Sequence, residues 1–197
     1  MDGIQLRDDR RRAGIGRFLL GLLQIILNPR QGWMDAALDN YDCRDLITKG
    51  LVPLLAVVAL TALIEPFYFS TLGFLPAIIK GVVDFTGYFA SVYLCNYFLN
   101  WALGMWVLDH YHIDDSKVQT LVIYTIASMA LMTLIDNVLP SDLAVLSFLP
   151  FYVFYIIWCA CRYLGIPDER KPYFFGVALG ALFLPPYLLS YCLSIFL

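Results

Sequence analysis

The fold class is decided by residues 118–139, which read VQTLVIYTIASMALMTLIDNVL. This run has no charged residue before Asp136. A helix needs about 20 predominantly apolar residues to cross the hydrocarbon core of a bilayer. The run is long enough for that, and it predicts a transmembrane helix.

Four other apolar runs flank this one, and short polar joints separate the last four runs of the chain. The short joints force neighbouring helices to be antiparallel. We therefore expect an all-α membrane protein, a bundle of five transmembrane helices preceded by two amphipathic interfacial helices. The predicted segments are a basic tail at 1–13, cytoplasmic amphipathic helices at 14–50, and a membrane domain at 51–197 with spans at 51–69, 81–108, 118–139, 143–164 and 173–197.

The composition supports this class. Of the 197 residues, 60% are hydrophobic and 15% are charged, whereas soluble domains have about 45–50% apolar and about 25% charged residues. The net charge of −3 is too weak to favour nucleic acid as a partner. The expected partners are membrane lipids, with other membrane proteins or a second copy as further candidates. The five cysteines are odd in number and four lie in apolar runs, so we expect free thiols rather than a disulfide framework.

The positive charges orient the chain. Of the 13 Lys and Arg residues, 12 lie before the first span, after the second, or at and after the end of the fourth, and Lys80 alone lies on the opposite side. Cytoplasmic loops are enriched in Lys and Arg. This asymmetry predicts a multi-pass protein of the cell inner (cytoplasmic) membrane, with its N-terminus in the cytoplasm and its C-terminus outside.

The segment 14–27 is apolar but too short to cross a bilayer comfortably. Its polar residues recur on one helical face, while the rest are Phe, Leu and Ile. This pattern favours a helix in the cytoplasmic interface, followed by a second helix that starts at Asn28-Pro29. The residues expected to contact the membrane interface are Arg17, Phe18, Leu22, Ile26 and Trp33. The alternative is a secretory signal peptide, but Arg17 interrupts the apolar region and no small-x-small cleavage site follows.

Several local patterns resemble the Yip (Ypt-interacting protein) family of multi-spanning membrane proteins, in its bacterial form. They are the apolar helix followed by Asn28-Pro29 and Trp33, the sequence Ser116-Lys117-Val118-Gln119 leading into Tyr124, and the run from Tyr152 that ends in Tyr163-Leu164-Gly165-Ile166-Pro167. The resemblance covers a single domain from about residue 18 to 197. It implies a membrane protein without catalytic residues. The Asp-Leu-Tyr-Gly-Pro motif of the eukaryotic members, which bind small GTPases, is absent from this sequence.

Polar residues inside the spans are the candidate functional residues. Glu65, Asp84 and Asp136 are all expected near the outer ends of spans, where together they could hold a cation or a proton. The alternative is that each acid is hydrated at a span end, with Lys80 and Asp84 forming an i,i+4 pair. Asn96 and Asn100 lie on one side of the second span and could belong to the same intramembrane polar site. They are expected to hydrogen-bond between helices, and contact with a substrate is the alternative.

The last span contains two further features. Gly176 and Gly180 form a Gly-x-x-x-Gly pattern, which is typical of close helix packing. Pro185-Pro186 near the middle predicts a kink. A break of this kind can mark a transport site, and a packed kink is the alternative.

The joint after the second span contains weak candidates for metal ligands, namely Asp109, His110, His112 and Asp114. His-x-His with nearby carboxylates can bind a transition metal. The alternative is a solvated turn in which Asp114 or Asp115 caps the next helix. Neither a nucleophile elbow, a Walker loop, a zincin helix nor a CxxC pair occurs in the sequence. We therefore predict no catalytic residues and no cofactors.

Two functions remain open at this stage. The first is a non-enzymatic scaffold or adaptor that acts in membrane organisation or in protein and lipid interaction. The second is a small-ion or lipid transporter or channel that uses Glu65, Asp84, Asp136 and the proline-kinked last helix. An intramembrane enzyme is a weaker third candidate.

Overall fold

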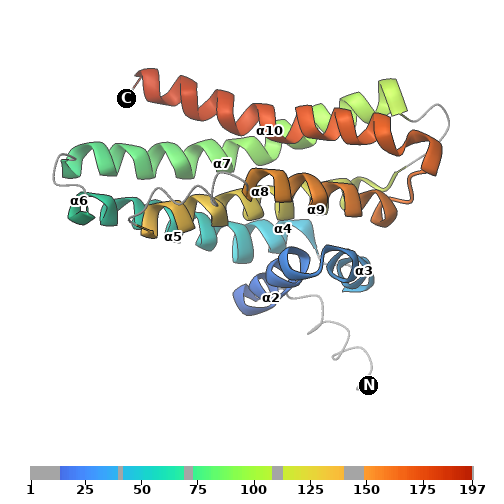
Figure 1. Ribbon diagram of the computed structural model, residues 1–197, viewed down its shortest axis with the longest axis horizontal. Helices are drawn as coiled ribbons and strands as arrows, with labels where there is room; N and C mark the ends of the chain where they lie inside the picture. The colour runs from blue at the N-terminus through green and yellow to red at the C-terminus, as the bar shows by residue number, and fades with distance from the viewer. Residues whose placement is uncertain (1–13, 40–41, 69–72, 108–112, 140–148, 197) are drawn as a thin grey trace.

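A computed structural model describes residues 14–39, 42–68, 73–107, 113–139 and 149–196. All regular structure in these ranges is helical. The long helices lie side by side along the longest axis of the molecule, and the two N-terminal helices, α2 (Ile15–Leu27) and α3 (Pro29–Asp39), pack against one flank (Figure 1).

Four of the described helices are long and apolar enough to cross a membrane, namely Cys43–Tyr68, Phe74–Met105, Asp115–Val138 and Asp168–Ile195. The first consists of α4 (Cys43–Asp45), a π-helical turn (Leu46–Leu51), α5 (Val52–Thr61), a 3₁₀ turn (Ala62–Ile64) and α6 (Glu65–Tyr68). The second is α7 (Phe74–Ala102) with a π-helical turn (Leu103–Val107), the third is α8 (Asp115–Val138), and the fourth is a 3₁₀ turn (Asp168–Arg170) with α10 (Lys171–Phe196). The protein is therefore an all-α membrane protein.

Two helix starts differ from the sequence prediction. The first long helix begins at Cys43 rather than at residue 51, because the π-helical turn continues the helix into α5. The second begins at Phe74 rather than at residue 81. The helix therefore includes Lys80, which lies just before the predicted start of the span and pairs with Glu65.

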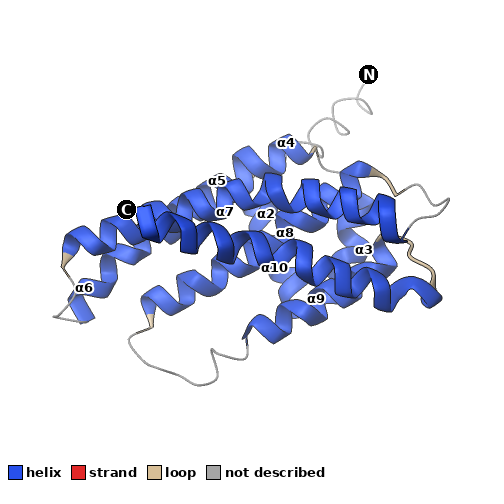
Figure 2. Ribbon diagram, turned by 90° about the horizontal axis from the view of Figure 1, so that it is seen from above, coloured by secondary structure: helices blue, strands red, loops and turns tan. Residues whose placement is uncertain are grey.

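The run 143–164 is described from Leu149 onwards. It forms α9 (Leu149–Tyr163), whose 15 residues are fewer than a typical span needs. In Figures 1 and 2, α9 runs back along the bundle beside α8 and α10, and it contacts both. Five long helices thus pack together, of which four satisfy the length and composition of a membrane span.

The helix α8 lies at the centre of the bundle. Every residue from Thr120 to Ala130 is buried, and α8 contacts α2, α5, α7, α9 and α10. Two of its buried hydroxyl groups turn back on their own helix, since Ser128 Oγ donates to the carbonyl oxygen of Tyr124 at 2.8 Å and Thr120 Oγ1 to that of Ser116 at 2.8 Å. Such bonds satisfy polar groups in an apolar interior. The Thr125 Oγ1 atom is also buried and has no hydrogen-bond partner among the described residues.

Candidate functional site

A polar cluster around Lys80 lies at the end of the bundle where α6 meets the start of α7. The Lys80 ammonium pairs with Glu65 and also donates to Asn137 Oδ1 on α8 at 2.9 Å. The amide of Asn137, which is buried, donates in turn to Thr61 Oγ1 at 3.3 Å. The predicted i,i+4 pair of Lys80 with Asp84 is wrong, because Lys80 reaches across to α6 instead of along its own helix.

The other two acids of the predicted site lie apart from this pair. Asp84 is half-buried, and its Oδ2 atom has no hydrogen-bond partner among the described residues although it is fully shielded from solvent. Asp136 is exposed and lines a separate cavity of about 200 Å³. In that cavity the hydroxyls of Tyr88 and Thr133 are hydrogen-bonded at 2.7 Å.

The three carboxylates therefore do not share one ligand site. Chemically, the cluster joins α5, α6, α7 and α8 through a buried amide and an ion pair. Asn137 was not predicted, since an amide beside Asp136 looks like part of a hydrated helix end.

Asn96 and Asn100 bond to each other rather than between helices. Asn100 Nδ2 donates to Asn96 Oδ1 at 3.3 Å, one turn apart on α7. The predicted interhelical bonding is wrong for this pair, because the two half-buried amides share one hydrogen bond along α7 instead. Asn96 also lines a cavity between α4, α7 and α8.

The predicted metal ligands are divided between described and undescribed residues. Asp109, His110 and His112 lie outside the described residues. Asp114 is the residue before α8, and its Oδ1 accepts a hydrogen bond from the backbone N–H of Ser116 at 3.1 Å. This confirms the helix-cap alternative for Asp114. Within the described part of the chain, no group of three or more His, Cys, Asp and Glu side chains could hold a metal ion.

The N-terminal hairpin α2–α3 packs on the bundle through an aromatic cluster. Phe18 stacks on Tyr124 of α8 with ring centroids 5.4 Å apart, and Trp33 lies edge-on to Tyr124 at 6.1 Å. Trp33 also lies 5.3 Å from Tyr163, and its indole N–H donates to the carbonyl oxygen of Ile156 at 3.0 Å. The approach is close, because a Cβ placed on Gly50 would come within 2.3 Å of the Phe18 ring.

This packing corrects the predicted membrane contacts. Phe18, Leu22 and Trp33 are each only 1% exposed, inside the protein. Ile26 is half-buried against the same core, and Arg17 is exposed. The opposite face of α2 is also apolar and lies on the surface of the protein, where Leu20, Leu23 and Leu27 are 68%, 46% and 81% exposed. Their i, i+3, i+7 spacing marks one stripe, but periodicity alone could not tell which of two apolar faces meets the protein.

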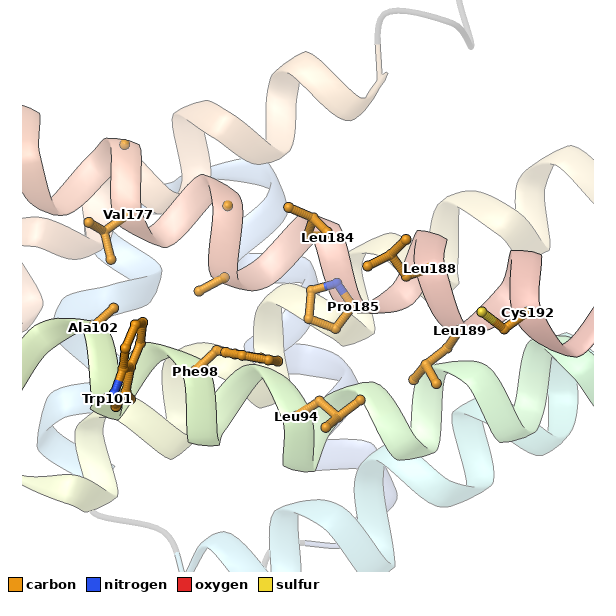
Figure 3. Close-up of a pocket in the computed structure, with 13 residues that line it drawn as sticks. Leu94, Phe98, Trp101, Ala102, Val177, Leu184, Pro185, Leu188, Leu189 and Cys192 are labelled. Carbon is orange, nitrogen blue, oxygen red and sulfur yellow. The ribbon is translucent and has the colours of Figure 1, made fainter.

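An apolar groove of about 440 Å³ lies between α7 and α10 (Figure 3). Leu94, Phe98 and Trp101 of α7 face Leu184, Pro185 and Leu188 of α10 across it. Gly176 and Gly180 also line the groove, and a Cβ placed on either would meet no atom within 4 Å. The predicted close-packing face is therefore not occupied by any of the described helices. Despite Pro185 and Pro186, α10 continues as one helix from Lys171 to Phe196.

Comparisons of the chain with protein-family models, with curated proteins and with solved structures found no match.

Proposed function

We propose that this protein is a non-enzymatic membrane scaffold or adaptor of the Yip type, which organises lipids and other membrane proteins by lateral contact. The observation that carries the proposal is the α7–α10 groove. A scaffold embedded in a bilayer needs a surface that a neighbour can occupy from within the membrane. The groove offers such a surface, because apolar side chains and two glycines line it.

The glycines indicate the kind of neighbour. Small residues let helix backbones approach closely, which is how transmembrane helices associate when lipid and side chains are equally apolar. The open space above Gly176 and Gly180 leaves room for that approach. The groove therefore suits an apolar helix of another membrane protein or of a second copy. When no such helix is bound, lipid acyl chains occupy the groove.

The orientation is part of the same proposal. In it, α9 is a fifth crossing, the N-terminus and the joint before α10 lie in the cytoplasm, and the C-terminus lies outside the cytoplasmic membrane. The arrangement of the helices supports this, since α9 runs between the end of the bundle where α8 finishes and the end where α10 begins (Figure 1). The distribution of Lys and Arg supports the assignment of the sides.

Photocrosslinking in native membranes tests the scaffold. A photoreactive amino acid at Leu188, in the groove, should give discrete protein adducts. The same group at Leu60, which is 63% exposed on α5, serves as the control and should give lipid adducts alone. Gly180→Leu should weaken the adducts formed at position 188. If positions 188 and 60 gave the same pattern, the groove would not be a protein-binding surface.

A transporter is the second candidate, and one observation favours it. A buried carboxylate oxygen without a partner, as at Asp84, is costly and often functional. Purified protein in proteoliposomes distinguishes the two functions. Flux of a small ion through the unsubstituted protein, abolished by Asp84→Asn, would favour transport. Flux no greater than that of empty liposomes would count against transport of that ion.

A further inference from the structure

A second cavity, of about 340 Å³, lies between the start of the first long helix, α7 and α8. Polar side chains from three helices line it, among them Arg44, Asn96 and Gln119, and apolar side chains such as Val92 and Ile123 line the remainder. Val92 and Ile123 are buried, whereas Arg44 is exposed. The cavity is thus polar towards its mouth and apolar towards the core, as an amphipathic ligand would require.

The position of Arg44 fits the headgroup region of a bilayer. Arg44 is the second residue of the 26-residue helix Cys43–Tyr68. At about 1.5 Å per residue such a helix is about 39 Å long, which exceeds a hydrocarbon core of about 30 Å. The helix is thus long enough for its first turn to reach the level of lipid phosphates.

Several donors at the cavity are free to bind a ligand. Lys49 pairs with Asp45 at 2.9 Å, whereas neither the Arg44 guanidinium nor the Gln119 amide has a hydrogen-bond partner among the described residues. The Asn96 oxygen accepts from Asn100, which leaves the Asn96 NH₂ group available. The guanidinium and the two NH₂ groups supply several donors around the cavity, and phosphate oxygens are acceptors that such donors bind.

The surrounding charges narrow the choice of headgroup. Asp42 and Asp114 cap the two helices that meet beside the cavity, accepting from the N–H groups of Arg44 at 3.0 Å and Ser116 at 3.1 Å. The two helix starts are adjacent, since the Cys43 thiol lies 3.6 Å from the carbonyl oxygen of Ser116. Among the described lining residues Arg44 is the one cation, and the two carboxylates lie beside Cys43 at the edge of the cavity. These charges match a zwitterionic headgroup better than a multiply negative one.

We propose that this cavity binds the headgroup of a zwitterionic phospholipid such as phosphatidylethanolamine, with its phosphate held by Arg44, Gln119 and Asn96. One acyl chain would enter between α7 and α8. The inference goes beyond the proposed function, because a scaffold and a transporter could both carry this site.

Native mass spectrometry of the full-length protein in detergent tests it. The probes are dioleoylphosphatidylethanolamine, dioleoylglycerol, which has the same chains without a phosphate, and inorganic phosphate. We expect adducts with the phospholipid alone. Arg44→Gln should lower its affinity about tenfold, since a charge-assisted bond is lost, and Gln119→Leu should lower it about threefold. Arg30→Gln, which removes an exposed arginine of α3 outside the cavity, should leave it unchanged.

Two results would overturn the proposal. Equal binding of dioleoylglycerol, or unchanged affinity in Arg44→Gln, would show that the headgroup is not recognised here. Arg44-dependent binding of inorganic phosphate at the same affinity would assign the site to a soluble anion instead of a lipid. The melting temperature without added lipid is the folding control. Arg44→Gln should have the same melting temperature as the unsubstituted protein, because Arg44 is exposed.

Discussion

Helices α8 and α10 are nearly equal in hydropathy and opposite in environment. The most apolar windows of the spans that contain them have mean hydropathies of 1.8 and 1.6, yet 67% of the first window and 22% of the second is buried inside the protein. In a bilayer, lipid and protein interior are about equally apolar. Hydropathy therefore identifies a membrane helix without telling whether protein or lipid surrounds it.

Residue size and shape separate the two helices better than hydropathy does. The buried run of α8 includes small residues and hydroxyls, with Thr125, Ala127 and Ser128 completely buried. On α10 the large side chains Tyr187, Leu188 and Tyr191 are more than half exposed. Small side chains let neighbouring helices approach α8 closely, whereas these bulky side chains of α10 lie at the surface of the protein.

Matched leucine truncations test this contrast and should give the largest effect. Leu121→Ala on α8 leaves a cavity at a fully buried position, and should cost about 2–5 kcal/mol of unfolding free energy. Leu188 on α10 is 52% exposed, so Leu188→Ala should cost less than about 1 kcal/mol of unfolding free energy. The measurement is denaturant unfolding in detergent micelles. Equal losses at the two sites would mean that α8 is no more enclosed than α10.

Removal of the Lys80 cation should have a smaller effect, at the end of the bundle where α6, α7 and α8 meet. Lys80→Met leaves Glu65 and Asn137 without their partner. The Lys80 and Glu65 side chains are 41% and 18% exposed, so the loss should fall between those of exposed and buried pairs, at about 1–3 kcal/mol. Lys80→Arg should restore most of it, and Lys117→Met should change little. A loss below about 0.5 kcal/mol in Lys80→Met would show that this ion pair does not hold the helices together.

The two faces of α2 repeat the contrast on a smaller scale. Replacing Leu20, Leu23 and Leu27 with Ser alters exposed positions, so the free energy of unfolding in detergent should change by less than about 1 kcal/mol. Phe18→Ser, at a position that packs on Tyr124, should cost several times more. In vesicles with brominated lipids, quenching of a fluorophore at Leu23 should exceed quenching at Leu22. Equal quenching at these neighbours would contradict the assigned faces.

The sequence predicted those features that depend on local chemistry. The run 118–139 forms α8, with ends shifted by a few residues, and Pro29 begins α3 as predicted. Asp114 caps α8, which was one of the two roles considered for it. The predictions that were wrong concern features that depend on which helices become neighbours. Lys80 has an acid four residues along its own helix, and only the tertiary fold brings Glu65 closer.

The same reason explains the hairpin and the groove. The apolar residues of α2 almost encircle it, so a single sequence could not show that Phe18 meets Gly50 while Leu20 stays outside. Gly176 and Gly180 match a packing motif, but whether a motif is filled within one chain depends on where α10 lies relative to α7. Hydropathy and spacing thus specify the helices, while their contacts follow from shape complementarity across distant segments.

The crossing number is tested most directly by a pair of topology reporters in living cells. One is fused after Leu197, and the other is inserted at Asp168, in the joint between α9 and α10. With α9 as a fifth crossing and the basic segments inside, the fusion after Leu197 should be active outside the cytoplasm and the insertion at Asp168 inside it. Two reporters on the same side, or a cytoplasmic signal after Leu197, would contradict the five-crossing bundle.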